Sequence, residues 1–256
     1  MASARHAAHA ADDRSLGQRL LRGLGEWLIY LLVAALVVTL VRVFLIQSYR
    51  VPSGSMEETL QVNDTIVAWK PGGVSRGDIV VFRDDLQWLD EADPEVPFWK
   101  EALAAVKLLP PQHEKYLVKR LIGLPGDHVT CCDAQGRVEV NGQALDESDY
   151  LYGDGPYASI AFDVVVPAGR IFVMGDHRDN SKDSRFWMCG GRIGSSTPTP
   201  DLAFPSLDAV QGKVFSVLLP LNRIRGFGRP ETFATVPDPV GKVPVSVDYT
   251  CPTIGG

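Results

Sequence analysis

An uncharged apolar segment near the start of the chain limits its possible folds more than any other feature. Residues 27–41 carry no charge, and residues 43–46 continue the segment beyond a single arginine, Arg42. About 20 helical residues, at ~1.5 Å each, cross the ~30 Å hydrocarbon core of a bilayer, and an arginine near the end of such a helix can reach the interface. We therefore predict a single transmembrane helix over residues 27–46, with the lipid bilayer as a partner.

The charges around this segment predict its orientation. Arg14, Arg19 and Arg22 lie upstream of it, and Arg42 and Arg50 lie near or beyond its end. Because basic residues are enriched on the cytoplasmic side of membrane spans, we expect a cytoplasmic tail at residues 1–26 and an extracytoplasmic region from residue 47. Two alternatives are a buried core helix and a cleaved signal peptide with a small-x-small site at residues 53–55. The polar or bulky residues 47–52 argue against cleavage there.

Composition excludes several other classes of protein. Apolar residues make up 45% and charged residues 22% of the chain, which is typical of globular proteins and not of disordered ones. The chain has 25 basic and 31 acidic residues, so its net charge of −6 does not provide the basic surface that a general nucleic-acid binder needs. We therefore predict no nucleic-acid partner.

The cysteines and acidic clusters do not predict a metal site. The chain has four cysteines: Cys131, Cys132, Cys189 and Cys251. They form no C-x-x-C pair, and the calcium-like pattern Asp179-x-Ser181-x-Asp183 has serine where a calcium loop needs glycine. We predict no metal and no cofactor. Outside the cytoplasm, Cys131 or Cys132 could form a disulfide with Cys189 or Cys251, and the sequence leaves the pairing open.

The region after the apolar segment consists mainly of short β-rich runs that end in turn residues. Six β-rich runs are separated by turn residues: 64–69, 78–82, 137–140, 162–166, 170–174 and 212–218. Asn141-Gly142 and residues 167–169 are typical of hairpin turns. Strands do not alternate with helices as in a parallel sheet, so we predict a mainly β fold of antiparallel sheets over residues 47–226.

Two parts of the chain depart from this β pattern. Residues 83–115 begin with acidic residues and then contain a possible helix at residues 98–107, so we predict an insertion between two strands. Residues 227–256 are rich in proline and have no sustained periodicity. We predict a loosely ordered tail from Arg229 onward.

Three dense segments carry residues that could perform chemistry: 52–56, 119–127 and 175–185. In the first, Ser53 and Ser55 flank Gly54, which suits a sharp bend where a backbone N–H and a hydroxyl meet a developing oxyanion. In the second, Lys119 follows an apolar strand, where burial would lower its pKa from about 10.4 toward the roughly 7 to 8 that a general base needs. Arginine in the same place could not lose its proton.

These segments, together with residues 77–82, resemble in their order the motifs of the bacterial type I signal peptidases. That family consists of membrane-anchored serine proteases that remove signal peptides from exported proteins. The resemblance covers about residues 44–220. It implies a single-pass serine endopeptidase of the cell membrane whose partners are preproteins carrying signal peptides. It also implies cleavage after small residues at −3 and −1 through an acyl-enzyme, with no cofactor.

The resemblance implies a role for each matching residue. Ser55 is the nucleophile and Lys119 is the general base of a Ser-Lys dyad. Ser53, with the Ser55 amide, forms the oxyanion hole, and Ser181 orients the lysine. Four charged residues are implied to brace the site as ion pairs: Asp183 with Arg185, and Asp176 with Arg120. Five apolar residues are implied to line the substrate pockets: Val51, Met56, Leu60, Leu117 and Val118.

One residue departs from the family's pattern. The family usually has proline where Glu58 stands, and a carboxylate close to Lys119 would oppose the role of that lysine as a base. We expect Glu58 to face solvent. Two alternatives remain: a serine hydrolase that uses a Ser55–His177–Asp183 triad, and a membrane-tethered domain that binds exported chains without cleaving them.

Overall fold

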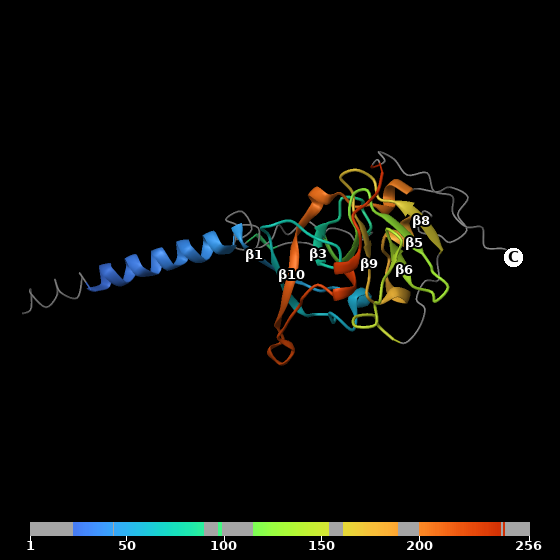
Figure 1. Ribbon diagram of the computed structural model, residues 1–256. Helices are drawn as coiled ribbons and strands as arrows, with labels where there is room; N and C mark the ends of the chain where they lie inside the picture. Colours follow the sequence, from blue (N-terminus) through green and yellow to red (C-terminus); the bar gives the residue numbers. More distant parts are fainter. Residues whose placement is uncertain are drawn as a thin grey trace, which may run out of the picture. The chain divides into compact units, whose positions relative to one another are not determined.

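The computed structural model describes residues 23–42, 44–89, 97–98, 115–153, 161–188, 200–241 and 243. The chain divides into two units, Met1–Leu45 and Ile46–Gly256 (Figure 1). The predicted cytoplasmic tail falls mainly on residues 1–22, which lie outside the described residues.

In the described part of the first unit, a 20-residue helix runs from Gly23 to Arg42. By length and composition it could cross a membrane. Its apolar side chains are exposed on all sides of the helix, as expected for a helix that is surrounded by lipid. The helix begins four residues before the predicted segment 27–46. The last residue of that segment, Ile46, instead begins a β-strand, because its backbone pairs with Trp69 of a neighbouring strand.

The second unit contains a large antiparallel sheet. Its strand order is β1-β2-β10-β3-β4-β9, and β11 pairs with β10. The strands are β1 (Ile46–Arg50), β2 (Thr65–Trp69), β3 (Ile79–Arg83), β4 (Tyr116–Gly123), β9 (Phe172–Met174), β10 (Val210–Leu219) and β11 (Arg225–Gly226). Every pairing within it is antiparallel. The ten-residue β10, orange in Figure 1, lies between β2 and β3 and holds the two halves of the sheet together.

A smaller antiparallel sheet lies beside β9, on the opposite side of the unit from β1 (Figure 1). Its order is β7-β6-β5-β8, with strands β5 (His128–Cys131), β6 (Val138–Val140), β7 (Gln143–Ala144) and β8 (Phe162–Val165). Among the described residues the remaining elements of this unit are short: η1 (Gly54–Met56), η2 (Arg178–Asn180), α3 (Ser184–Trp187), η3 (Pro200–Ala203), η4 (Leu207–Ala209), η5 (Leu221–Arg223) and η6 (Glu231–Thr235). The two sheets confirm the prediction of a mainly antiparallel β fold.

The two predicted turns have different outcomes. Asn141 and Gly142 both have positive φ, 53° and 79°, as a two-residue hairpin between β6 and β7 requires. Residues 167–169 do not form a hairpin as predicted, because the strands they join belong to different sheets. β8 pairs with β5 in the small sheet, and β9 pairs with β4 in the large one.

The prediction of a loosely ordered C-terminal tail is wrong for its first part. Phe233, on η6, and Val236 are buried in the apolar cluster that the small sheet forms with β9. A side chain at Gly77 would collide with the Phe233 ring, so that glycine allows the tail to pack closely. The burial of these two apolar residues fixes a segment that has no periodic pattern.

The predicted insertion at residues 83–115 begins as part of the core. Trp88 is buried against Phe82 of β3, and its indole Nε1 donates a hydrogen bond of 2.8 Å to the carbonyl of Leu202. Apart from Phe98, the helix predicted at residues 98–107 lies outside the described residues.

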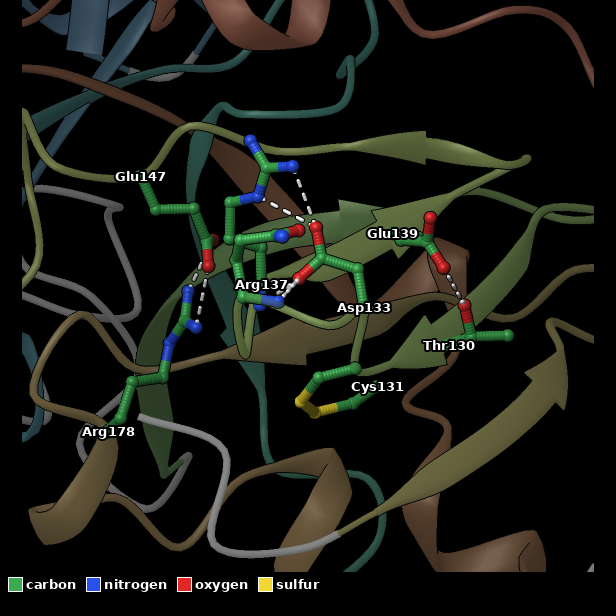
Figure 2. The surroundings of a disulfide bond; sticks show 9 residues. Thr130, Cys131, Asp133, Arg137, Glu139, Glu147 and Arg178 are labelled. Atoms are coloured by element: carbon green, nitrogen blue, oxygen red, sulfur yellow. Dashed lines mark hydrogen bonds and ion pairs between the residues drawn. A yellow bond between two sulfur atoms is a disulfide. The ribbon is translucent and has the colours of Figure 1, made fainter. Parts of the chain in front are cut away.

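The cysteine pairing differs from every pairing that the sequence analysis considered. Cys131, at the end of β5, is bonded through its Sγ to the Sγ of its neighbour Cys132 (Figure 2). Adjacency in the chain brings these two thiols together without any tertiary contact. Neither cysteine is therefore available to Cys189 or Cys251, which lie outside the described residues.

Candidate active site

Ser55 lies on the single turn η1, which follows β1 and reverses the chain. The turn is closed by the N–H of Glu57, which donates to the carbonyl of Gly54 at 3.1 Å. The carboxylate of Glu57 folds back over Gly54, where a Cβ would lie 2.8 Å from it. The turn buries most of Ser55 and all but 1% of Met56.

Lys119 lies in the middle of β4, where its backbone pairs with Val80 of β3. Only 3% of the residue is exposed. Its Nζ donates a hydrogen bond of 2.5 Å to Oγ of Ser55, a residue 64 positions earlier in the chain. The fold therefore brings the two predicted catalytic side chains into direct contact.

Burial lowers the pKa of Lys119 from 10.5 to about 8. Desolvation of the ammonium is the largest cause, the carboxylate of Asp183 partly opposes it, and Arg185 adds to it. Because a tenfold change in proton affinity is worth about 1.4 kcal/mol, the buried ammonium costs about 3 kcal/mol of stability below pH 8. A charged lysine in this place therefore lowers the stability of the fold.

The two serines that were predicted to support the dyad, Ser53 and Ser181, lie near Ser55. Ser53 precedes η1 in extended conformation, and its hydroxyl donates to Oγ of Ser55 at 3.5 Å. Oγ of Ser181 is buried and has no hydrogen-bond partner among the described residues. A Cβ at Gly175 would collide with both Oγ of Ser181 and the carbonyl oxygen of Ser55. The unpaired hydroxyl of Ser181 thus lies close to the nucleophile's turn and is free to bind another polar group.

The structure contains both predicted ion pairs, and both are buried. Nε and Nη2 of Arg120 donate to the two carboxylate oxygens of Asp176 at 2.8 and 2.6 Å, and Nε and Nη2 of Arg185 donate to those of Asp183 at 2.9 and 2.8 Å. Burial alone would raise the pKa of Asp183, but Arg185 reverses this and holds that pKa below its usual value. Asp183 also accepts from the N–H of Gly175 at 2.9 Å. These bonds fix the loop after β9 against the strand that carries Lys119.

The same loop contains a third buried ion pair that the sequence analysis did not identify. Nη1 and Nη2 of Arg178 donate to the carboxylate of Glu147 at 2.8 and 2.5 Å (Figure 2). The hydroxyl of Tyr150 donates to the same carboxylate at 2.5 Å. The guanidinium of Arg120 lies 3.9 Å from the centre of the Tyr150 ring. Glu147 lies outside the three dense segments, so no local pattern indicates this pair.

The residues of the alternative triad do not meet in the described contacts. Nδ1 of His177 forms its hydrogen bond with the carboxylate of Glu57 at 2.9 Å, and its ring is stacked on Tyr152 at 4.0 Å. Only the backbone N–H of His177 reaches Ser55, where it donates to the carbonyl oxygen at 3.1 Å. Asp183 is occupied by Arg185, so the contacts favour the lysine as the base.

The five predicted pocket residues are all buried, but the structure does not bring them all together. Four of them pack in one apolar cluster: Val51, Met56, Leu60 and Val118. Leu117 packs in a different cluster with Val80 and Phe82. Neighbouring residues of a strand point to opposite faces, so Leu117 and Val118 do not share one pocket. Glu58 is exposed, as expected.

Among the residues that the structure describes, no three His, Cys, Asp or Glu side chains gather in a way that could hold a metal ion. The arrangement of Ser55, Lys119 and the neighbouring serines is suited to nucleophilic acyl transfer, with one side chain as nucleophile and the other as base.

The chain is similar to several known proteins. A model of the family described as "Signal peptidase, peptidase S26" matches residues 24–218. "Probable signal peptidase I-2" of Synechocystis is 36% identical over 151 residues, which cover 57% of this chain and 58% of that protein. "Probable signal peptidase I" of Mycobacterium leprae is 31% identical over 212 residues, 72% of each chain. A crystal structure of a signal peptidase I from Enterococcus faecalis has a TM-score of 0.33 and 22% identity, covering 56% of this chain and 97% of that one.

The extent of these matches differs between relatives. The chain spans less than two thirds of the length of the Synechocystis protein, and 62% of "Signal peptidase I" of Mycobacterium tuberculosis, with which it is 31% identical over 185 residues. The family match nevertheless covers most of this chain, from the N-terminal helix to the end of β10. The chain belongs to the signal peptidase family, peptidase S26.

Proposed function

We propose that this protein is a membrane-bound serine endopeptidase that cleaves N-terminal signal peptides from exported preproteins with a Ser-Lys dyad. The observation that carries the proposal is the 2.5 Å contact between Nζ of a buried lysine, Lys119, and Oγ of Ser55. The family of this chain and the names of its relatives support the substrate class.

The proposed reaction has two steps. Neutral Lys119 takes the proton of the Ser55 hydroxyl while Oγ attacks the carbonyl carbon after residue −1 of the preprotein. The resulting oxyanion accepts hydrogen bonds from the hydroxyl of Ser53 and the backbone N–H of Ser55. Lys119 then gives its proton to the departing amine, and water hydrolyses the acyl-enzyme with the lysine again acting as the base. Ser181 orients the lysine through its hydroxyl.

The helix Gly23–Arg42 is proposed to anchor the protein in the bilayer with a single pass. Its N-terminal end faces the cytoplasm and the β-sheets lie outside, because the arginine-rich flank precedes the helix. A preprotein reaches the site through its own apolar signal segment, which lies in the same membrane. Anchoring therefore brings enzyme and substrate together.

The pH dependence of cleavage follows from the titration of Lys119. Only the neutral amine can accept a proton, and its pKa is lowered to about 8. We expect kcat/KM to rise about tenfold per pH unit below pH 8 and to level off above it. Cleavage of a peptide substrate between pH 6 and 10 measures this profile. An inflection near pH 6.5, the range of an unperturbed histidine, would point to the triad instead.

The proposed specificity is tested with purified, detergent-solubilised protein and a preprotein, with the products identified by mass spectrometry. We expect cleavage after alanine at −1, and a fall in kcat/KM of about a hundredfold when that alanine is replaced by leucine, since shallow pockets do not accept a long side chain. The same replacement at −2 is the control and should change cleavage little. Equal cleavage of the −1 variants would contradict the pocket assignment, and no cleavage of any preprotein would contradict the function.

A further inference from the structure

The chain leaves the nucleophile's turn through a backbone conformation that is rare for its residue type. Glu58, three residues after Ser55, has φ of 74°, in the left-handed region where non-glycine residues are uncommon. Its side chain is exposed, so burial of the side chain does not hold it there. Proline cannot adopt this conformation, because its ring fixes φ near −65°. Another interaction must hold this turn in place.

Arg225 provides that interaction from the other end of the chain. Its Nη2 donates to the carbonyl oxygen of Glu58 at 2.8 Å and also to the carbonyl oxygen of Thr59. The arginine belongs to β11, where it pairs with Val217 of β10, and its guanidinium lies 5.1 Å from the centre of the Phe227 ring. A charged donor that bridges two successive carbonyls favours the backbone direction in which both oxygens point toward it.

The bridged segment connects the nucleophile to the strand that carries the base. On one side, the N–H of Leu60 donates to the carbonyl of Met56 at 2.6 Å, which ties the segment to the turn of Ser55. On the other side, the hydroxyl of Thr59 donates to Asp176 at 2.5 Å, and Asp176 pairs with Arg120, the neighbour of Lys119. A change of direction at Glu58 would therefore move Ser55 relative to Lys119.

We propose that Arg225 is a positioning residue of the peptidase: by holding the carbonyls of Glu58 and Thr59, it maintains the left-handed turn that aims Ser55 at Lys119. This inference rests on the proposed function. Arg225 does not touch the reacting atoms, and it acts only through the backbone of the residues that follow the nucleophile.

The test compares three variants of the full-length protein in detergent. Arg225→Met keeps an unbranched apolar side chain but removes the donors, and Arg225→Lys restores one charged donor. Arg137→Ala is the matched control, since Arg137 is exposed and hydrogen-bonds to Asp133 beside the small sheet (Figure 2). Arg225→Met is expected to lower kcat by about ten- to a hundredfold, the usual effect of a small misplacement of a catalytic group, with KM within about twofold. Arg225→Lys should lie between this variant and the parent, and Arg137→Ala should match the parent.

Two further measurements separate positioning from general loosening of the fold. If Lys119 stays buried, the apparent pKa of the kcat/KM profile is the same in Arg225→Met and in the parent. Adding Glu58→Gly to Arg225→Met should restore at least part of kcat, because glycine adopts positive φ without steric cost. The proposal is overturned if Arg225→Met cleaves like the parent, if its apparent pKa rises toward 10.5 with a lower Tm, or if Glu58→Gly restores nothing. Failure of the parent to cleave a preprotein would instead contradict the proposed function.

Discussion

Replacing Lys119 by arginine or methionine is expected to lower kcat/KM for signal-peptide cleavage by at least about a thousandfold, within the range attributed to a general base. Arginine keeps its proton at any accessible pH, and methionine has no basic group. Lys119→Met should at the same time raise the free energy of unfolding at pH 7 by up to about 3 kcal/mol, because it removes a buried ammonium whose pKa is lowered to about 8. Steady-state cleavage and denaturant unfolding measure the two effects.

The stability gain of Lys119→Met has a defined pH window. The folded protein holds the proton of Lys119 less tightly than the unfolded chain, so the penalty is complete below pH 8 and fades as the pH approaches 10.5. His177→Ala is the control for activity and should retain most of it, since the ring bonds to Glu57 and not to Ser55. An active Lys119→Arg variant, or a folded but inactive His177→Ala variant, would favour the triad.

Asp176→Ala is expected to reduce the free energy of unfolding by about 3 to 5 kcal/mol, because it leaves a charged arginine buried without its partner. Asp176 has no exposed surface, and Arg120, which donates two hydrogen bonds to it, is 2% exposed. The variant also removes the acceptor of the Thr59 hydroxyl. Urea unfolding followed by tryptophan fluorescence measures the loss.

The matched control for this loss is Asp163→Ala. Asp163 forms a 2.6 Å contact with His128 across the exposed face of the small sheet, and both side chains face solvent. Exposed pairs contribute at most about 1 kcal/mol, so this variant should unfold almost like the parent. Equal losses in the two variants would show that burial does not determine the strength of the Asp176 pair.

Several strands were predictable because they depend on local patterns. The runs at residues 78–82 and 162–166 became β3 and β8 within one residue at each end, since short runs rich in β-branched and aromatic residues favour strands. Segments that lack such a pattern were misjudged. Trp88 and Phe233 lie in irregular stretches, and their rings stack on Trp187 and Tyr150, partners distant in the chain that no local rule identifies.

The residues of the candidate site fall into the same two groups: some are marked by local motifs, and others are found only through tertiary contacts. Ser55 and Lys119 could be identified because short motifs surround each of them, and the sequence also supplied the pairs Asp183–Arg185 and Asp176–Arg120. The pairing of Arg178 with Glu147, and the bond between His177 and Glu57, had no such signal. Glu147 and Glu57 both lie outside the three dense segments, so no motif marked them as partners.

By itself, the sequence determined the apolar helix, the antiparallel β character and the residue types available for acyl transfer, because each depends on periodicity or on short-range motifs. Only the tertiary structure decided that Nζ of Lys119 reaches Oγ of Ser55 and that its burial lowers the pKa of the lysine. It also decided that Arg225 holds the carbonyl of Glu58, 167 positions earlier in the chain. Desolvation and hydrogen-bond geometry are set by which strands pair and which side chains pack together, and these long-range contacts are not encoded in any single stretch of residues.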